Sequence, residues 1–591
     1  MIRQSGFRSR AISLALFFVP LVYATMMLST ASTSLFQIDD PHEFRFVAEA
    51  DSIMSILGTD VFHFFRPVKN ILFILFSRLA PFGIVWCHAI GVLIAVLSFY
   101  SVQALCRRIL GTKEKALLAA SIWLFSPTLV SSAAWLSSIN IMAMVAFAAG
   151  SLTLHDSSWD RGHYRASRTL LAGFALFLAL LSYECAVSAV PLLFLFDIYL
   201  RPGRIRTKSS TEAHVLYWTI AALYLILRHI GSAKTGTGGL YFIDTEKWQI
   251  IVSSPWFFAQ HSLLWFWPFG RLFILGSYRW GEVPGWELAI CWLLLLSVVF
   301  WCLTRIRKHT ISKYCLLFFF VGFAPTSNCL GFGNGPFGDY YMSLASIGLS
   351  AWVADQIISA TGRTGKGRIP ALALALVLAI TRIWGLAESA SWAAAWGNGT
   401  EVIAASVRNR PEFFSNKVVL AMSIFGEERY EEALQLCHQA EEFIGPDSRH
   451  MANIFALRGE YEMLVNHDDS TALSLFDEML RVDSSEETKK KRHFHRGKVF
   501  EILRKDILSA EQEYELAVTG NDPNLPAAHR LALVKDRSGR SEEAFAIWER
   551  IARIKPDDDS ALWHLVMACR KKGDERRASA FESRALKLGG H

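Results

Sequence analysis

Residues 286–304 read WELAICWLLLLSVVFWCLT, a stretch in which Glu287 carries the one charged side chain. A helix of this length reaches across a hydrocarbon core of about 30 Å, so the stretch predicts a membrane-spanning helix. Similar apolar runs recur up to residue 388, whereas charges are spread evenly beyond it. The chain is 52% hydrophobic and 19% charged, against about 25% charged in an average soluble domain. We therefore expect an all-α chain, with a polytopic membrane domain before a soluble helical one.

The positions of Lys and Arg predict how the expected spans are oriented, because cytoplasmic loops are enriched in these residues. Basic segments lie at residues 1–10, 107–115, 161–168, 201–208, 305–313 and 363–368. If all of them face the cytoplasm, consecutive segments must enclose an even number of crossings. Eleven candidate spans meet that condition, at residues 11–30, 83–105, 116–133, 137–154, 169–183, 185–200, 214–230, 286–304, 314–328, 341–359 and 370–387.

This count predicts a cytoplasmic N-terminus and a non-cytoplasmic C-terminal part. The first apolar run is expected to stay as an uncleaved helix, because no small-x-small cleavage site stands out and many spans follow. Two further apolar stretches, residues 68–80 and 248–270, would break the parity, so we expect interfacial or re-entrant helices there. Short loops favour a bacterial inner membrane, with the C-terminal part in the periplasm.

The C-terminal part carries a 34-residue repeat. Ala510, Ala544 and Ala578 lie 34 residues apart, and the aromatic residues Tyr514 and Trp548 follow the first two by four positions. This is the tetratricopeptide pattern, in which small residues let two antiparallel helices pack closely. We expect about five units in residues 412–591, joined by a linker at 389–411 to a membrane domain at 1–388. Such arrays present a concave surface, which predicts a binding partner and not chemistry.

Polar residues at the expected non-cytoplasmic ends of the spans are the candidates for chemistry. They form four segments: Asp39-Asp40 with His42 and Glu43, Arg66 with Lys69, Tyr183-Glu184, and Gly338-Asp339-Tyr340-Tyr341. Paired carboxylates can accept the proton of a hydroxyl. Arg and Lys can hold a phosphate, and an ionisable residue near membrane depth points to function.

Each of these segments also has a structural interpretation. Asp40 and Asp339 can cap helix N-termini, Arg66 and Lys69 can reach lipid headgroups, and Glu184 can be a satisfied structural carboxylate. No Ser-His-Asp arrangement, phosphate-binding Gly-rich loop or His/Cys metal spacing is visible, so no metal ligand is predicted. No interleaving of basic and aromatic residues predicts a nucleic-acid groove.

The order of these segments resembles the transmembrane and tetratricopeptide-repeat-containing O-mannosyltransferases and their bacterial relatives, which are GT-C glycosyltransferases. Asp39-Asp40 is similar to the family's first-loop acidic signature, and Arg66-Pro67 to its Arg-Pro-Leu element. Residues 183–197 are similar to its Lys-Glu…Pro…Asp stretch, and residues 126–140 to its His-Pro…Trp-Ile…Arg stretch. Residues 339–348, DYYMSLASIG, align without gaps to Glu-Arg-Tyr-Leu-Tyr-Leu-Pro-Ser-Ile-Gly, and two tryptophans precede the repeats as in the family.

Three positions depart from the family pattern. Tyr340 stands where the family has Arg, Asn140 where it has Arg or Lys, and Ser126 where it has His. The resemblance therefore shifts the expected contacts to the donor phosphate onto Arg66, Lys69 and Tyr341.

The resemblance implies transfer of a sugar from a polyprenyl-phosphate carrier to a protein or glycan hydroxyl outside the cytoplasm, with inversion at the anomeric carbon. It implies Asp39 or Asp40 as the base and Glu184 as an orienting carboxylate. The further substrate-binding candidates are His42, Glu43, Asn140, Asp339 and Tyr340. The expected partners are the lipid-linked donor, the acceptor and membrane lipid, without a cofactor or nucleic acid. The alternatives are a non-enzymatic membrane scaffold whose repeats recruit envelope proteins and, third, a transporter.

Overall fold

The computed structural model divides into two compact units, each of which is described by itself. Unit 1 comprises Met1–Leu35, Leu57–Leu72 and His88–Arg410, and unit 2 comprises Phe36–Ile56, Phe73–Cys87 and Pro411–His591. The structure describes residues 2–31, 40–49, 52–58, 64–159, 163–231, 242–243, 245–273, 276–304, 310–328, 335, 337–361, 365, 368–444, 449–519, 524–555 and 558–588. Helices dominate these residues, and the strands are one parallel pair, β1 (Phe242–Ile243) and β2 (Tyr278–Arg279). The all-α class expected from the sequence is confirmed.

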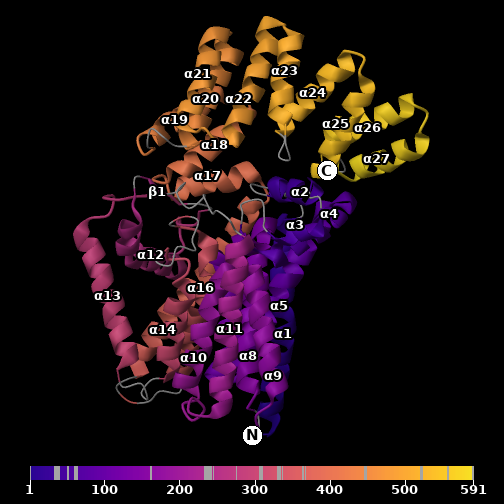
Figure 1. Ribbon diagram of the computed structural model, residues 1–591. Coiled ribbons are helices and arrows are strands. Elements are labelled where there is room, and N and C mark those ends of the chain that lie inside the picture. The colour runs from indigo at the N-terminus through magenta and orange to yellow at the C-terminus, as the bar shows by residue number, and fades with distance from the viewer. Residues whose placement is uncertain are drawn as a thin grey trace. The chain divides into compact units, whose positions relative to one another are not determined.

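Unit 1 is a bundle of long helices (Figure 1), and short 3-10 segments lie at some of the breaks between them. Its elements are α1 (Ile2–Ala31), α6 (Lys113–Leu124), η2 (Pro127–Leu129), α7 (Val130–Ala134), η3 (Leu136–Ser138), α8 (Ile139–Ser157), α9 (Ala166–Ser182), η5 (Glu184–Ser188), α10 (Ala189–Leu200), α11 (Lys208–Gly231), α12 (Lys247–Phe266), α13 (Gly285–Leu303), α14 (Thr310–Phe323), η7 (Asp339–Met342), α15 (Ser346–Thr361), α16 (Arg368–Trp396) and α17 (Gly399–Asn409). The helices α3 (Ile53–Gly58), α4 (Pro67–Leu79) and α5 (Ile84–Leu110) contribute residues to both units.

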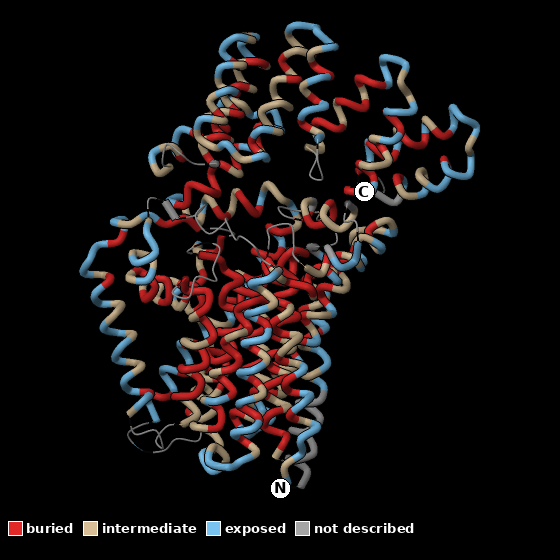
Figure 2. The backbone as a smooth tube through the Cα atoms, viewed as in Figure 1, coloured by how far each residue is buried: buried red, intermediate tan, exposed pale blue. Residues whose placement is uncertain are grey.

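Several helices of unit 1 have the length and composition of membrane spans. Within the described residues these are α5, the run Leu136–Ser157, Lys208–Ile230 of α11, α13 and α16. A sixth arises if α6 and Pro127–Ala134 are one broken span, bent by 62°. Most residues of α13 are exposed or half-buried (Figure 2), and its apolar residues Leu293 and Phe300 are 65% and 70% exposed. An apolar helix of this kind is stable against lipid, so the chain is a membrane protein.

The remaining expected spans coincide in part with shorter helices. The described apolar helices Leu14–Ser29, Ala166–Ser182 and Thr310–Phe323 lie within or close to the expected spans 11–30, 169–183 and 314–328. The stretches 68–80 and 248–270 form α4 and α12, neither of which is among the helices long and apolar enough to cross a membrane. The number of eleven crossings and the orientation of the chain stay predictions. So does the domain division, whose expected boundary at residue 388 falls inside α16.

Close helix packing in unit 1 depends on a glycine in the DYYMSLASIG segment. An ideal Cβ built on Gly348 of α15 would collide with the carbonyl oxygen of Cys315 and lie 2.9 Å from the backbone nitrogen of Phe319, both in α14. Small residues at helix contacts let backbones approach this closely, which is how helices associate within lipid. The glycine therefore fixes where α15 begins relative to α14.

Among its described residues, unit 2 is a tetratricopeptide-repeat solenoid of five consecutive helix pairs (Figure 1). The segments α2 (Asp40–Glu49) and η1 (Ala80–Phe82) also belong to this unit. The pairs are α18 (Phe414–Gly426) and α19 (Tyr430–Glu441), α20 (Arg449–Tyr461) and α21 (Asp469–Val482), α22 (Glu486–Val499) and α23 (Ile507–Val518), α24 (Leu525–Arg537) and α25 (Ser541–Ile554), and α26 (Asp559–Lys571) and α27 (Glu575–Leu588). Single π turns, η9 (Glu462–Asn466) and η10 (Phe500–Arg504), extend α20 and α22.

The 34-residue pattern places its small residues where the repeat helices meet. Ala510, Ala544 and Ala578 are all buried, with at most 2% of their surface exposed. A Cβ built on Gly497 of α22 would lie 2.5 Å from the ring of Tyr514 in α23, so a glycine is required at that contact. The segment α2, which follows the first expected span, packs against α25 within the same unit.

Candidate functional site

Arg66 and Glu184, 118 residues apart in the chain, form a buried ion pair in unit 1. The Nε of Arg66 donates to Oε2 of Glu184 at 2.9 Å, and its Nη2 donates to Oε1 at 2.6 Å. The side chains keep 8% and 1% of their surface. A two-point contact between a guanidinium and a carboxylate fixes the orientation of both groups. The structure thus unites two of the residues that the sequence singled out.

Local backbone explains how these two side chains reach each other. Arg66 precedes Pro67, the first residue of α4, and the residue before a proline is disfavoured in helical conformation. Tyr183 interrupts the chain between α9 and η5 with φ −157° and ψ 131°, so Glu184 starts a new helical segment. Both side chains therefore come from chain breaks between helices, where polar groups can turn inward.

Aromatic rings cover the guanidinium of Arg66. Its Cζ lies 4.1 Å from the ring centroid of Phe64 and 4.5 Å from that of Tyr183. Cation–π contacts of this kind strengthen when water is excluded. Burial opposes ionisation of Glu184, but the charge and hydrogen bonds of Arg66 outweigh it, and the pKa of the carboxyl lies below its ordinary value. The pair is therefore ionised, and Arg66 is held inside the protein instead of reaching lipid headgroups.

Asn140, a substrate-binding candidate, is engaged in holding the same chain break. Its side-chain amide donates to the backbone oxygen of Ser182 at 2.7 Å, directly before Tyr183 and Glu184. The amide is buried in α8, where a donor without a hydrogen-bond partner would be costly. Asn140 thus positions the break that presents Glu184.

A second buried carboxylate, Asp339, lies at the start of η7. Its Oδ2 accepts hydrogen bonds from Ser131 Oγ of α7 and, at 3.2 Å, from Trp392 Nε1 of α16. Its Oδ1 accepts from the backbone nitrogen of Tyr340 at 2.7 Å. Complete burial raises the pKa of Asp339 to about 7, although these three hydrogen bonds favour the ionised form. A carboxyl with a pKa near neutrality can exchange a proton at physiological pH.

Aromatic rings also pack beside the second carboxylate, Asp339. The rings of Tyr340 and Tyr341, which follow it in η7, lie 4.8 Å apart. Tyr341 also faces the ring of His261 at 6.1 Å with an interplanar angle of 23°. Tyr340 packs edge-on against Trp135 at 6.2 Å, and Trp135 stacks on Trp396 at 5.9 Å. The Arg66–Glu184 pair and Asp339 are thus both buried in unit 1, and aromatic rings pack around each of them.

The acidic segment of the first loop lies in unit 2. Asp40 begins α2 and is buried, as is Glu43, while Nδ1 of His42 contacts Nη2 of Arg45 at 2.8 Å. Asp39, the other candidate for the base, lies outside the described residues. Lys69 is described in unit 1, in the first turn of α4, and is 2% exposed.

The structure also adds residues that sequence reasoning missed. Ser131 and Trp392 bind Asp339, and His261 is buried with its ring nitrogens at 2.8 Å from the oxygen of Phe257 and 3.3 Å from that of Gly338. His261 lies on a face of α12 that is buried within the protein. The serine pair Ser131-Ser132 in the expected span 116–133 was a signal for the Ser131 contact that sequence reasoning did not use.

Arg382 is a charged residue within the expected span 370–387 that sequence reasoning did not single out. Its Nη2 donates to the backbone oxygens of Trp265 at 2.5 Å and Phe266 at 3.1 Å, where α12 ends. Its guanidinium lies 4.1 Å from the ring centroid of Trp265. The charge satisfies the last carbonyls of a helix, which is a structural role at a helix C-terminus.

No protein-family model matches the chain, and no curated protein matches it. Among solved structures, two crystal structures of MamA are 17% identical with TM-scores of 0.22 and 0.21, over 29% and 30% of this chain and 95% and 93% of theirs. The apo crystal structure of the Archaeoglobus fulgidus oligosaccharyltransferase is 14% identical with a TM-score of 0.37, over 64% of this chain and 56% of that one. Likenesses at these identities and TM-scores define neither a family nor an activity for this chain.

Proposed function

We propose that the protein is a membrane glycosyltransferase that moves a sugar from a polyprenyl-phosphate carrier to a hydroxyl acceptor on the non-cytoplasmic face. The observation that supports this most is the buried pair of Arg66 and Glu184, because a fixed, water-excluded guanidinium is suited to binding a phosphate. Both residues stand in segments that resemble a family of O-mannosyltransferases.

Arg66 is the proposed phosphate-binding residue, and Glu184 acts through it. Glu184 accepts hydrogen bonds from two nitrogens of the guanidinium, Nε and Nη2. This contact sets the plane of the guanidinium before the donor arrives, which lowers the entropic cost of binding. Glu184 is therefore a positioning residue in this proposal, in place of the direct contact with sugar or acceptor that we expected.

The reaction proposed is a single displacement. The acceptor oxygen attacks the anomeric carbon, the bond between that carbon and the phosphate oxygen breaks, and the lipid phosphate leaves with the electron pair. The hydroxyl proton passes to a carboxylate, for which Asp39 and Asp40 are the candidates. Attack opposite to the leaving group inverts the anomeric centre. Arg66, with Lys69 and Tyr341, would stabilise the charge that develops on the phosphate.

Asp339 supplies a second candidate for the proton acceptor. Its pKa of about 7 leaves a substantial fraction ionised at neutral pH, and it is buried in unit 1, as Arg66 is. The repeats of unit 2 would bind the acceptor, since such arrays present concave surfaces to peptides and proteins.

The experiment is transfer from radiolabelled undecaprenyl-phosphate mannose and glucose by the full-length protein in proteoliposomes, with donor binding measured separately. We expect Arg66→Lys to lose donor binding, because one ammonium cannot reproduce the two-point contact with Glu184. Asp39→Asn and Asp40→Asn should keep donor binding, and the variant that lacks the base should lose about 10²–10⁴-fold in transfer rate. Glu401→Gln, which alters an exposed pair with Arg408, is the control.

Full transfer by both Asp39→Asn and Asp40→Asn would remove these carboxylates as the base and leave Asp339. Wild-type protein that binds no lipid-linked sugar would contradict the enzymatic proposal and favour a non-enzymatic scaffold that recruits envelope proteins through its repeats.

A further inference from the structure

Three residues from three helices of unit 1 meet at one carboxylate oxygen. Nε2 of His155, in α8, lies 3.2 Å from Oδ2 of Asp197 in α10, and Nε2 of His214, in α11, lies 3.1 Å from the same atom. All three side chains are buried, and their ligand atoms lie within 4.8 Å of one another. The proposed glycosyl transfer uses none of them.

The spacing of these atoms matches a zinc coordination sphere. Zinc binds imidazole nitrogen and carboxylate oxygen at about 2.0–2.2 Å in a tetrahedron, so neighbouring ligand atoms lie about 3.3 Å apart. The two nitrogen–oxygen distances of 3.2 and 3.1 Å are already at that value. The ligand nitrogens of the two imidazoles lie within 4.8 Å of each other, and coordination would bring them closer.

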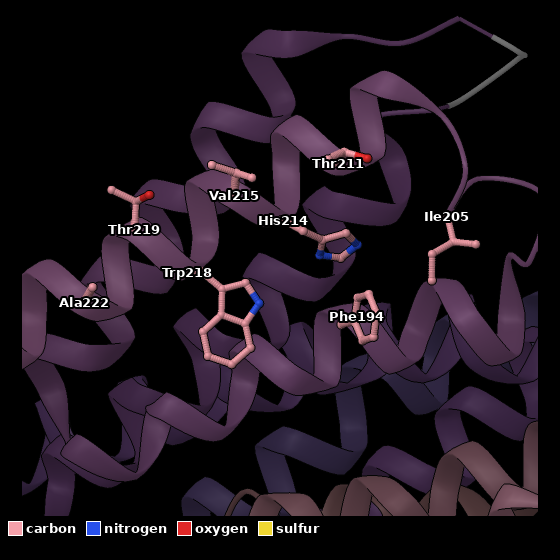
Figure 3. A pocket seen from close by; sticks show the side chains of 8 residues that line it. All are labelled: Phe194, Ile205, Thr211, His214, Val215, Trp218, Thr219 and Ala222. Atoms are coloured by element: carbon pink, nitrogen blue, oxygen red, sulfur yellow. The ribbon is translucent and has the colours of Figure 1, made fainter.

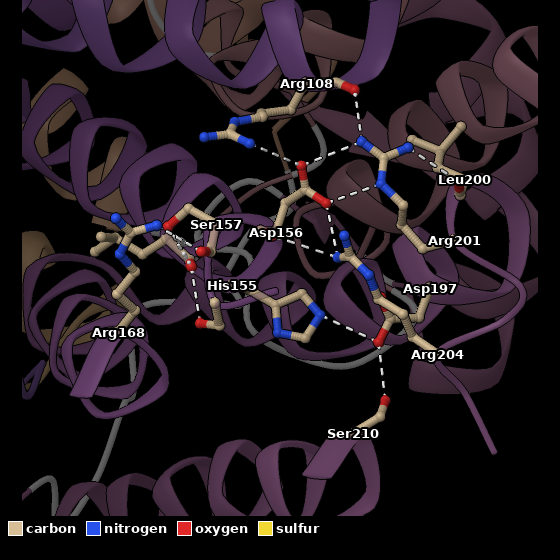
Figure 4. Close-up of polar contacts among 12 residues, drawn as sticks. Arg108, His155, Asp156, Ser157, Arg168, Asp197, Leu200, Arg201, Arg204 and Ser210 are labelled. Carbon is tan, nitrogen blue, oxygen red and sulfur yellow. Dashed lines mark hydrogen bonds and ion pairs between the residues drawn. The ribbon is translucent and has the colours of Figure 1, made fainter. Parts of the chain in front are cut away.

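The charge of Asp197 also calls for a cation. Asp156 directly follows His155 in α8. It forms ion pairs with Arg201 at 2.9 Å, with Arg204 at 2.8 Å and with Arg108 at 3.4 Å (Figure 4). Asp197, in contrast, has no Lys or Arg partner among the described residues, and its Oδ1 is buried there without a hydrogen-bond partner. A buried carboxylate needs a compensating charge, which a divalent metal ion bound by neutral histidines supplies.

Residues behind the ligands fix their orientation, as metal sites require. Nδ1 of His155 lies 3.1 Å from the hydroxyl of Tyr217, and Ser210 Oγ donates to Oδ2 of Asp197 at 3.0 Å. A tyrosine hydroxyl can donate or accept. It can therefore accept a hydrogen bond from Nδ1–H when Nε2 binds a metal, and donate one to Nδ1 when Nε2 carries the proton.

An open hollow leads to His214. The hollow has a volume of about 470 Å³ and is lined by apolar side chains, Thr211, Thr219 and the imidazole of His214 (Figure 3). The imidazole of His214 is therefore part of the wall of this hollow, on the side away from the bundle interior where Asp197 lies buried.

We propose that His155, Asp197 and His214 bind one Zn²⁺ ion that ties α8, α10 and α11 together. Two imidazoles and a carboxylate are ligands that zinc prefers. The three ligands lie on separate helices, at positions 155, 197 and 214, so the ion acts as a cross-link within the bundle. The consequence is structural: binding to the folded state alone raises the stability of unit 1.

The test uses full-length protein purified in detergent, stripped with a chelator and reloaded with ZnCl₂. We expect one zinc per chain by mass spectrometry of the metal content, and a melting temperature that rises on zinc addition. Asp197→Asn and His214→Ala should weaken binding at least tenfold, as loss of a ligand does, and abolish the zinc-dependent rise. His88→Ala, which removes a buried histidine outside the cluster, should bind zinc as the wild type does.

Cobalt substitution keeps the test decisive if a variant fails to fold. Wild-type protein loaded with Co²⁺ should show the intense visible absorption of four-coordinate cobalt, and Zn²⁺ should displace it. Wild-type protein that takes up no zinc and gives no such spectrum overturns the proposal, and the cluster is then a pair of histidines hydrogen-bonded to Asp197. Preferential uptake of iron over zinc would overturn the choice of metal.

Discussion

A buried ion pair such as Arg66–Glu184 is costly to assemble, since both groups lose their hydration. The bidentate contact and the two aromatic rings around the guanidinium offset that cost. Removing one partner, in contrast, leaves the other as an uncompensated charge inside the protein. The pair therefore constrains both stability and the proposed site.

Glu184→Gln should destabilise the protein by about 3–5 kcal/mol, the cost of leaving a buried charge without its partner. The measurement is thermal unfolding of full-length protein in detergent. The control Glu401→Gln breaks a pair with Arg408 in which both side chains are at least half exposed, so about 0–1 kcal/mol is expected. Equal effects of the two substitutions would show that burial does not set the strength of the Arg66 contact.

Asp339 predicts a pH dependence with a defined sign. Its pKa is raised from 3.8 to about 7, so the folded state binds a proton that the unfolded state has released over that interval. The contribution of Asp339 to the free energy of unfolding is therefore complete below about pH 4. It decreases by on the order of 4 kcal/mol as the pH rises to about 7. In the Asp339→Asn variant, the melting temperature should no longer decrease between those two pH values. An unchanged pH slope in the variant would contradict the burial of an ionisable Asp339.

At the scale of elements, breaks between helices produce the candidate site. Pro127 ends the run of α6, because proline lacks an N–H and clashes with the preceding turn. The resulting 62° bend carries Ser131 toward Asp339. The extended backbone of Tyr183 likewise interrupts the helical run, so that Glu184 reaches Arg66. Irregular backbone at membrane depth is tolerated where it is buried in protein, so these breaks lie where polar chemistry is possible.

Gly348→Ala should destabilise unit 1, because the added methyl group meets the backbone of α14, which cannot move aside as a flexible side chain would. We expect a loss of about 1–3 kcal/mol, typical of overpacking, seen as a lower melting temperature in detergent. Gly150→Ala in α8 is the matched control, since a Cβ there meets nothing within 4 Å. A stable Gly348→Ala variant would mean that α14 and α15 are further apart than described.

At the scale of the whole molecule, the distribution of basic residues predicts the sidedness of the membrane protein. Cytoplasmic enrichment in Lys and Arg orients membrane proteins during insertion. If the chain crosses an odd number of times, unit 2 and the candidate site segments are non-cytoplasmic, as the proposed glycosyl transfer requires. A single additional crossing would invert this arrangement.

Labelling of introduced cysteines tests the orientation. Gln435→Cys in α19 and Arg206→Cys in a basic segment both replace exposed residues. We expect a membrane-impermeant maleimide to label Gln435→Cys in intact spheroplasts and Arg206→Cys only after permeabilisation. The unsubstituted chain gives the background, and the described cysteines are buried or half-buried free thiols. Labelling with the opposite pattern would place the repeats in the cytoplasm and contradict their role in binding an extracytoplasmic acceptor.

Local patterns were enough to predict the class of the elements and to single out some residues of the candidate site. The 34-residue spacing of alanines predicted the repeat solenoid, because that spacing follows from how each helix pair must pack. The motif positions of Arg66 and Glu184 singled out both residues, but their mutual contact was not predicted, since nothing in either segment refers to the other. Trp392 was noted only as preceding the repeats, and it turned out to bind Asp339.

The sequence by itself determined the all-α class, the membrane character and the repeat architecture, because each depends on hydrophobic length or periodicity within a short stretch. The tertiary structure alone decided which polar residues meet. Glu184 reaches Arg66 across 118 residues, and His155, Asp197 and His214 converge from three helices. Such contacts depend on how whole helices pack, so no local pattern in residues 286–304 or any other single stretch contains them.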